Sequence, residues 1–188
     1  PANSAPAILT SSSSTRPIDP ITFRNACGAF ATGVTIITTR LAERDHGMTA
    51  NAFMSISLDP PLIAVSIART AKMLPLIQSA GRFGVSVLAS GTEDLAMHFA
   101  GRPKETIIEP LRELDGLPVA KQAAAVFATD VEQAVDAGDH VIFLGRVSAL
   151  ETIAEAQPLT FHKGRFGRLQ EETPPLLDPD WMLEGNHW

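Results

Sequence analysis

The sequence of 188 residues has a single cysteine and no tyrosine, and its 21 Asp and Glu outnumber its 15 Lys and Arg. Cys27 alone allows neither an internal disulfide nor a zinc site built from several thiolates, which fits a reducing cytoplasm. The net charge of −6 lacks the basic excess with which proteins neutralise nucleic-acid phosphates. No apolar run approaches the ~20 residues of a membrane helix, and no secretory signal pattern opens the chain. We therefore expect a cytoplasmic protein without a nucleic-acid or membrane partner.

The length fits one domain flanked by two tails. Residues 1–16 are rich in Ser, Ala and Pro with one charge, which predicts a disordered or draped N-terminal tail. Residues 171–188 contain three prolines but also several large apolar side chains, among them Trp181 and Trp188. We expect this segment to be an arm that packs on something, such as a second subunit. Residues 17–170 are then the domain.

Within that domain the pattern is rich in β-strands. Asp19 and Pro20 predict a helix start, and we expect this helix to reach Ala31 with Ile21, Ala26 and Phe30 on its inner face. Further short helices are expected at 72–79, followed by Gly81, and at 92–101. A turn at 43–47 and an irregular loop at 102–118 complete the connections. Strands are expected at 34–39, 48–53, 62–67, 83–88, 125–135, 140–150, 159–162 and 165–169.

Strands in this number, with helices inserted between them, indicate a mainly β fold that forms a β-barrel rather than alternating βαβ units. Several common sites are excluded by their motifs. GAFATG (28–33) is followed by Val34-Thr35 and not by the Lys-Ser/Thr of a phosphate loop. The sequence contains neither G-x-G-x-x-G nor G-x-S-x-G, and its histidines are not spaced like metal ligands. We interpret Cys27 as a small buried side chain rather than a nucleophile.

Small hydroxyl and amide residues gather around the second expected strand, in the stretch GMTANAFMSIS (47–57). Short side chains expose backbone N–H and C=O groups, which can bind a planar heterocycle. The same residues could instead satisfy a turn-rich hairpin, and the residue chemistry alone favours this second interpretation.

Five segments, in order, resemble the short-chain flavin reductase family with its FMN-binding split-barrel fold, which is Greek-key-like. They are TGVTIITT, GMTANAFMSISLDPPLIAVSI, GRFGVSVL, GDHVIFLGRV and PLTFHKGRFGRL. The similarity runs from about Phe23 to Leu169. The family comprises the reductase components of two-component flavin-dependent monooxygenases, and the resemblance makes a flavin site the better interpretation of the second strand.

The resemblance implies roles for individual residues. His140 would lie near the nicotinamide, and Arg165 and Phe166 would hold the pyridine nucleotide. Arg69, Thr70 and Lys72 would meet the flavin phosphate, which also suits a helix N-terminus with cations. Ser55 and Ser57 would flank the isoalloxazine ring. The ring itself would be lined, largely through backbone amides, by Thr32, Gly33, Val34, Thr35, Ile36, Thr49, Ala50, Asn51, Ala52 and Phe53.

The implied function is that of an NAD(P)H:flavin oxidoreductase that treats FAD or FMN as a substrate and supplies reduced flavin to a partner monooxygenase. A non-catalytic flavin-binding protein and a tightly flavin-bound oxidase are the alternatives. Thr70-Ala71-Lys72-Met73 departs from the family's Ser-Ser-x-Thr and leaves FAD or FMN open. Lys163, Arg165 and Arg168 could hold the 2′-phosphate of NADPH or be surface charge. Exposed strand edges and the apolar arm predict a homodimer.

Overall fold

The computed structural model describes residues 17–170, so both expected tails, 1–16 and 171–188, lie outside the described residues. The helices are α1 (Pro20–Cys27), α2 (Met73–Ala80) and α3 (Glu93–Phe99). The strands are β1 (Thr32–Gly33), β2 (Thr35–Leu41), β3 (Arg44–Ala50), β4 (Phe53–Leu58), β5 (Pro61–Ala68), β6 (Arg82–Leu88), β7 (Leu111–Leu114), β8 (Leu117–Ala120), β9 (Ala123–Ala137), β10 (His140–Thr152), β11 (Thr160–His162) and β12 (Arg165–Gly167).

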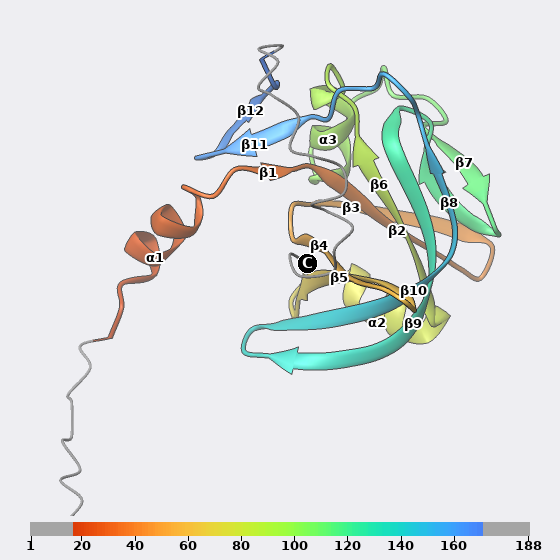
Figure 1. Cartoon of the computed structure of the whole chain (residues 1–188), viewed down its shortest axis with the longest axis horizontal. Coiled ribbons are helices and arrows are strands. Elements are labelled where there is room, and N and C mark those ends of the chain that lie inside the picture. Colours follow the sequence, from red (N-terminus) through yellow and green to blue (C-terminus); the bar gives the residue numbers. More distant parts are fainter. Residues whose placement is uncertain (1–16, 171–188) are drawn as a thin grey trace, which may run out of the picture.

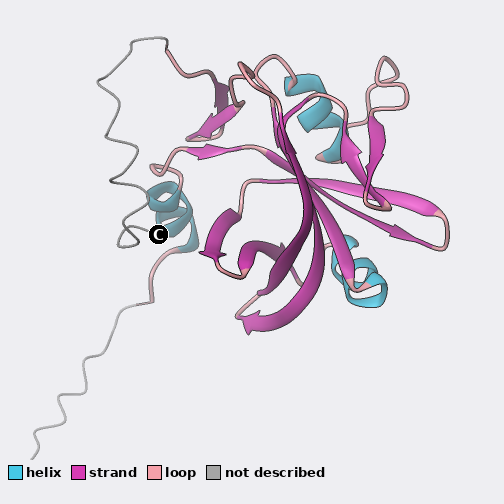
Figure 2. Cartoon of the chain, turned by 45° about the vertical axis from the view of Figure 1, so that its right-hand side comes forward, coloured by secondary structure: helices cyan, strands magenta, loops and turns pink. Residues whose placement is uncertain are grey.

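Seven strands form one curled antiparallel sheet in the order β3-β2-β6-β9-β10-β5-β4 (Figure 1). Its edge strands, β3 and β4, are not paired with each other, so the sheet is open. Helices α2 and α3 cover opposite ends of it (Figure 2). A smaller sheet of β1, β11 and β12 stands apart, together with α1. We refer to α1, β1, β11 and β12 as the flap.

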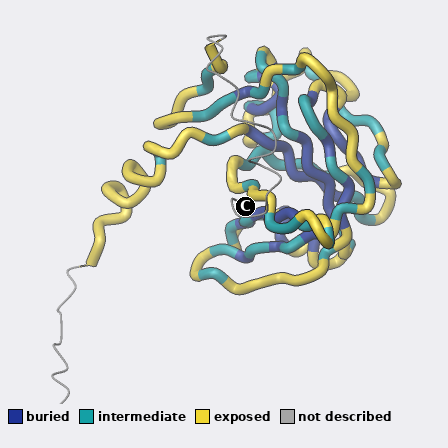
Figure 3. Tube along the Cα trace, in the orientation of Figure 1, coloured by how far each residue is buried: buried dark blue, intermediate teal, exposed yellow. Residues whose placement is uncertain are grey.

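The buried residues lie mostly on the strands of the curled sheet (Figure 3), and their side chains form two clusters. One is built around Phe83 and Phe143, whose ring centroids lie 6.5 Å apart, and is closed by α2. The other is built around Ile36 and Leu95 and is closed by α3. Strand side chains alternate between the two faces of β2, so Ile37 joins the first cluster and its neighbour Ile36 joins the second.

Most of the expected elements are present. Asp19 caps α1 by accepting a hydrogen bond from the Thr22 amide at 2.8 Å, and Gly81 ends α2 in the left-handed conformation. The long β9–β10 hairpin turns at Gly138 and Asp139, and Gly138 has a positive φ. Strands β11 and β12 are joined by a turn at Lys163 and Gly164, and both of these residues have a positive φ. The mainly β architecture with inserted short helices is confirmed.

The expected first helix is wrong in its length and in its packing. It ends at Cys27, with Gly28 as its C-cap, rather than at Ala31. None of its residues is buried, and the side chains expected on an inner face are exposed, Ile21 by 71% and Phe30 by 77%. Cys27 is likewise exposed and not a buried core residue. Helix α1 carries large apolar side chains, but no other part of residues 17–170 packs against them.

Three connections also differ from expectation. The turn expected at 43–47 is confined to Ala42 and Glu43, so β3 already begins at Arg44. The strand expected at 48–53 is the end of β3 and the start of β4, with a bend between them. The loop expected at 102–118 contains β7 and the start of β8. None of the helices within residues 17–170 combines the length and apolarity needed to cross a membrane.

Candidate functional site

Two adjoining hollows lie between the flap and the curled sheet. The inner hollow, about 320 Å³, is lined by Phe30, Thr32, Asn51, Ala52, Phe53, Met54, Ala64, Val65, Ser66 and Ile142. The outer hollow, about 700 Å³, is lined by Arg24, Asn25, Cys27, Gly28, Phe30, Thr32, Asn51, Phe161, Lys163 and Gly164. Three residues, Phe30, Thr32 and Asn51, line both, so the two hollows form one continuous depression.

The floor of the inner hollow is the outward face of β4, β5 and β10. Met54 is paired with Ala64, and Ser66 is paired with Ile142. The residue between Ala64 and Ser66, Val65, points the other way and is buried. Ala64 and Ser66 are small, so no long side chain rises from the sheet at this point and the floor is flat. A planar ring of moderate polarity fits such a surface.

The wall of the inner hollow is polar. Asn51, between β3 and β4, donates a hydrogen bond from its side-chain amide to the Thr32 hydroxyl of β1 at 3.4 Å. The Ser66 amide donates to the Ala52 carbonyl at 3.2 Å, which holds the Asn51–Ala52 bend against β5. The bend therefore places a carboxamide and a hydroxyl at the edge of a flat apolar floor.

The ring-lining residues expected from the sequence divide into two groups. Thr32, Asn51, Ala52 and Phe53 line the inner hollow together. The side chains of Val34, Thr35 and Ile36 are instead buried in the sheet, with 2% exposure or less, and Thr49 donates its hydroxyl to the Ala96 carbonyl of α3 at 2.6 Å.

The remaining residues of that set lie around the inner hollow without lining it. Ala50 closes β3, where its carbonyl accepts a hydrogen bond from the Thr35 hydroxyl at 2.7 Å. Gly33 is exposed in β1. Ser55 and Ser57 lie further along the edge strand β4, on either side of a register shift.

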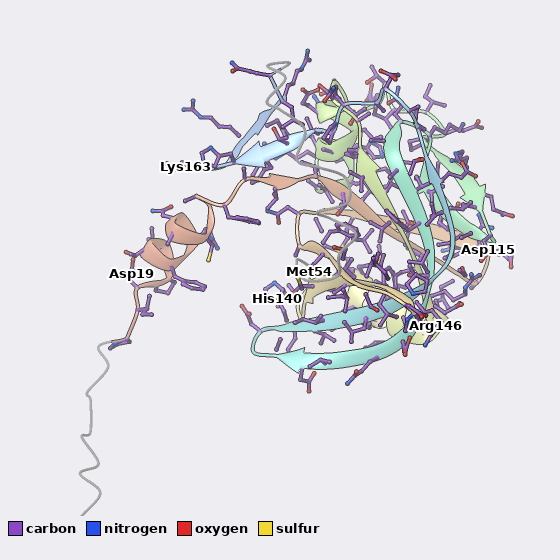
Figure 4. The ribbon with its side chains drawn as sticks, in the orientation of Figure 1. Asp19, Met54, Asp115, His140, Arg146 and Lys163 are labelled. Atoms are coloured by element: carbon purple, nitrogen blue, oxygen red, sulfur yellow. The ribbon has the colours of Figure 1, made fainter. Side chains whose placement is uncertain are left out.

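His140 opens β10 and is paired with Ala68 of β5. It is two residues from Ile142, so both side chains emerge on the face that forms the floor of the inner hollow. Figure 4 shows Met54 and His140 on the same side of the molecule. His140 Nδ1 lies 2.7 Å from Asp139 Oδ1, and this hydrogen bond lowers the pKa of Asp139. An ionised carboxylate only accepts, so Nδ1 of His140 donates to Asp139, and in the neutral form of the ring Nε2 is then an acceptor.

Arg69 joins the start of the α2 region to the tip of the β9–β10 hairpin. Its amide donates to the Asp139 carbonyl at 2.9 Å, and its Nε donates to the Gly138 carbonyl at 3.0 Å. Its guanidinium also pairs with Asp136 at 2.6 Å. The structure thus brings the expected phosphate residue Arg69 and the expected nicotinamide residue His140 together, with Arg69 already engaged.

Thr70 and Lys72 are exposed next to Arg69, at the N-terminus of α2. The helix offers fewer amide donors here than the sequence suggested, because Leu74 N donates to the Ala71 carbonyl and Pro75 has no N–H. Lys72 forms no ion pair with another residue of the described part of the chain. Thr70 and Lys72 therefore remain the groups that a phosphate could reach.

Arg165 and Phe166 lie apart from the inner hollow. They line a third depression, about 490 Å³, together with Thr160, His162 and Lys163. Phe166 packs edge-to-face on Phe161, with ring centroids 5.6 Å apart. The structure thus places these residues on the flap and not in the inner hollow. Within residues 17–170 no group of three His, Cys, Asp or Glu side chains could hold a metal ion.

Several lining residues had no expected role, and they are of two kinds. Ala64, Ser66 and Ile142 form the floor, and the alternation of small and large residues in LIAVSI (62–67) is the signal that marks it. Phe30 and Met54 are exposed apolar residues that no sequence pattern assigned to a ligand.

Comparison with known proteins places the chain among flavin reductases. Residues 27–170 match the flavin reductase like domain. The reductase component of 4-hydroxyphenylacetate 3-monooxygenase from Thermus thermophilus is 43% identical over 148 residues, 78% of this chain and 95% of that protein. An NADH-dependent flavin reductase from a Rhodococcus species is 42% identical over 156 residues, 81% and 88% of the two chains.

Among solved structures, the flavin reductase PheA2 superposes with a TM-score of 0.78 at 46% identity, covering 82% of this chain and 100% of that one. This similarity confirms the expected split-barrel fold.

Proposed function

The chain belongs to the family of flavin reductase like domains, and from this membership we propose that it is an NADH-dependent flavin reductase. It transfers a hydride from NADH to FAD or FMN and supplies the reduced flavin to a partner monooxygenase. One relative is named as an NADH-dependent flavin reductase and another as the reductase component of a monooxygenase. The family and the type of enzyme predicted from the sequence are thereby confirmed.

The inner hollow is the feature that carries the proposal. Its floor is flat and its rim holds the Asn51 carboxamide and the Thr32 hydroxyl, which suits the apolar face and polar edge of an isoalloxazine ring. Flavin and nicotinamide supply the redox chemistry themselves, so the protein has to hold the two rings face to face. No strong acid or base is required of the chain.

His140 orients the nicotinamide in this proposal. Its Nε2 is an acceptor on the face that carries the floor of the inner hollow, and the nicotinamide carboxamide has an N–H₂ group that donates to such an acceptor. Asp139 holds the imidazole in the required tautomer. Fixing the carboxamide fixes the distance between the hydride donor and acceptor atoms, on which the rate depends steeply.

Thr70 and Lys72 bind the flavin phosphate in the same proposal, and Arg69 contributes by holding this segment in place. The support is their exposure beside the N-terminus of α2 and the absence of an ion pair at Lys72 within residues 17–170. Arg165 and Phe166 bind the pyridine nucleotide on the flap side. Gly33 and Ala50 contact the flavin through their backbone, and Ser55 and Ser57 flank the ring in this proposal.

The flavin is proposed to be a substrate that comes and goes. The inner hollow offers neutral hydrogen bonds, worth only about 0.5–1.5 kcal/mol net each, and few cations. Micromolar binding corresponds to about −8 kcal/mol and suits a protein that releases its product at each turnover. The purified protein is therefore expected to be nearly colourless.

A homodimer is part of the proposal. Ile21 and Phe23 on α1, and Phe30 and Met54 at the inner hollow, are large apolar side chains that are more than half exposed. An exposed apolar surface of this kind is typical of an interaction site. A second copy that packs against α1 would also close the inner hollow from the side of Phe30 and Met54. We place the protein in the cytoplasm, which suits its single cysteine, and treat residues 17–170 as the catalytic domain and 171–188 as an arm.

One assay tests the enzyme. Protein is mixed with NADH and either FAD or FMN, and the nicotinamide absorbance is followed over time. Saturable NADH oxidation that requires added flavin supports the reductase. Binding of flavin without NADH oxidation would favour the non-catalytic binder, and a stoichiometric flavin that survives gel filtration, with no stimulation by free flavin, would favour the bound-flavin oxidase.

A further inference from the structure

The inner and outer hollows form one depression whose apolar surface is open within residues 17–170. Met54, beside the floor of the inner hollow, is 57% exposed. In the proposed function, flavin covers this floor only until the reduced flavin leaves. An apolar surface that is uncovered at every turnover is a place where another apolar group binds in turn.

Two cations line the outer hollow from different elements. Arg24 lies in the last turn of α1, and Lys163 lies in the turn between β11 and β12. The Lys163 amide donates to the Gly28 carbonyl at 3.1 Å, and Figure 4 shows Lys163 on the side of α1. Neither cation forms an ion pair with another residue between 17 and 170. A group that fills the whole depression should therefore combine apolar and acidic side chains.

The arm, residues 171–188, has this composition. It lies outside the described residues, and its sequence contains five Asp and Glu but no Lys or Arg. By contrast, residues 160–170 contain three Lys and Arg and no Asp or Glu. In the arm, Trp181 follows Asp178 and Asp180. A large aromatic side chain next to carboxylates complements an apolar floor next to two cations.

The arm begins close to the depression. Strand β12 is three residues before the arm; it lies next to β11, and β11 lies next to β1, whose Thr32 lines both hollows. Neighbouring strands are about 4.7–4.9 Å apart, so β12 is roughly 10 Å from β1. Ten residues separate Gln170 from Trp181, and ten extended residues span up to about 33–36 Å. Trp181 is therefore within reach of the inner hollow of its own chain.

Covalent attachment makes even a weak contact of this kind effective. A segment on a short linker has an effective concentration of about 1 mM, so a contact with an intrinsic dissociation constant of about 0.1 mM is formed roughly ten times as often as it is broken. A ligand that needs the same surface then binds about tenfold more weakly than it binds the open depression.

We propose that the arm binds in the depression of its own chain when flavin is absent. Trp181 covers the floor of the inner hollow, and the carboxylates of Asp178 and Asp180 face the two cations of the outer hollow. The arm and the isoalloxazine ring thus compete for one floor, and the arm takes the place of the reduced flavin as it leaves. The identity of the competing ligand rests on the proposed function, whereas the contact between the arm and the depression does not.

Tryptophan fluorescence tests the contact without any ligand. The chain has no tyrosine, and its two tryptophans, Trp181 and Trp188, are both in the arm, so their emission reports on the arm alone. The full chain with Trp188→Phe is used, which leaves Trp181 as the single tryptophan. We expect blue-shifted emission that is protected from acrylamide quenching. Emission typical of tryptophan in water, with full access to acrylamide, would overturn the proposal.

The cations are tested in the same background. Arg24→Gln together with Lys163→Gln should increase acrylamide access to the tryptophan at least threefold. Arg44→Gln together with Arg102→Gln is the matched control, since both arginines are exposed and neither forms an ion pair within residues 17–170. Equal effects of the two pairs would refute the proposed placement of the carboxylates.

Competition is tested by flavin binding. Trp181→Ala in the full chain should lower the dissociation constant for FMN about tenfold, which corresponds to ~1.4 kcal/mol, and leave kcat at saturating flavin unchanged. Trp188→Ala, which has no acidic neighbours in the sequence, is the control and should change neither. An unchanged dissociation constant for Trp181→Ala would overturn the proposal.

These measurements are separate from the test of the reductase. A protected tryptophan at position 181 in a chain that oxidises no NADH supports the contact and counts only against the reductase function. Flavin-dependent NADH oxidation in a chain whose Trp181 is open to acrylamide preserves the reductase function and refutes the contact. Protection that is lost on dilution of the protein would show that the arm reaches a second copy, and it would overturn the contact within one chain.

Discussion

The curled sheet and helix α1 make opposite use of large apolar side chains. In the sheet, Phe83 and Phe143 are fully buried, and buried hydroxyls such as that of Thr129, which donates to the Phe83 carbonyl at 2.6 Å, are satisfied. In the flap, α1 has no buried residue and Phe30 is exposed. The sheet therefore stabilises itself, whereas α1 and Phe30 present apolar surface to something outside the described chain, which we take to be a second copy.

The largest difference is expected when the same substitution is made in both regions. Phe143→Ala removes a fully buried ring and should lower the free energy of unfolding by about 3–5 kcal/mol. Phe30→Ala removes an exposed ring and should cost the monomer about 0.5 kcal/mol or less. Urea unfolding at several protein concentrations measures both. Any loss for Phe30→Ala should vary with concentration, as a dimer contact does. A large decrease in the free energy of unfolding for Phe30→Ala that does not depend on protein concentration would show that Phe30 stabilises the monomer, as Phe143 does.

A smaller contrast concerns added volume. A Cβ on Gly84 in β6 would lie 2.5 Å from Thr38 Oγ1 and 2.8 Å from the Pro118 carbonyl oxygen. Gly84→Ala should therefore destabilise the protein by about 1–3 kcal/mol. A Cβ on Gly33 in the flap meets nothing within 4 Å, so Gly33→Ala serves as the matched control in thermal unfolding. Similar losses for the two variants would show that the flap is packed as tightly as the sheet.

Association should depend on the exposed apolar face of α1. Ile21→Asp places a charge on the exposed apolar face of α1 and should weaken dimerisation by at least tenfold, or ~1.4 kcal/mol, while the monomer stays folded. Ile108→Asp, which alters an equally exposed residue outside the flap, is the control. Sedimentation equilibrium measures both variants. A stable monomer for the unaltered chain would remove the dimer from the proposal.

Substitution of His140, beside the inner hollow, should change the kinetics of the enzyme and not the stability of the fold. His140→Asn should raise KM for NADH or lower kcat by about tenfold, ~1.4 kcal/mol, with flavin affinity unchanged. The reason is that the carboxamide acceptor is displaced while the floor of the inner hollow remains. Unchanged kinetics for NADH and flavin would show that His140 only opens a strand.

The smallest effect is expected from Asp139→Asn, because Asp139 acts through His140. The hydrogen bond from His140 lowers the pKa of Asp139, so the ionised contact is present above the ordinary aspartate pKa and is lost as pH falls through the lowered one. The variant should therefore differ from the unaltered chain in KM for NADH near neutral pH and converge with it in acid. A difference that persists unchanged at low pH would rule out this positioning role.

The parts of the fold that sequence could predict are those that local chemistry determines. The β-branched run at 34–39, the Asp19-Pro20 helix start and the glycine turns of two hairpins all specify their conformation within a few residues. The length of α1 was not predictable in this way, because its apolar face has no partner within residues 17–170. Strands β4 and β7 were not predicted as separate strands because they carry few buried residues. Strand β8 was not predicted because its four residues include Pro118, which argues against a strand.

The candidate site likewise combines features that neighbouring residues determine with features that only the tertiary structure determines. The residues of the motif around Asn51 lie together in the wall of the inner hollow, because a backbone bend and its side chains are neighbours in sequence. The motif could not locate the floor, since Ser66 and Ile142 become neighbours only through the β5–β10 register. The assignment of Val34, Thr35 and Ile36 to the ring stays a prediction about their backbone, because the side chains of all three are buried in the sheet.

The attachment of Arg69 to the hairpin tip has a consequence for motion. Two main-chain acceptors, at Gly138 and Asp139, and the Asp136 carboxylate all bind this one residue. The end of a long ribbon and the segment leading into α2 therefore open to solvent together, as one cooperative unit of local unfolding. Amide hydrogens on both sides of the junction should exchange at a common rate, and a ligand that protects one side slows exchange on the other.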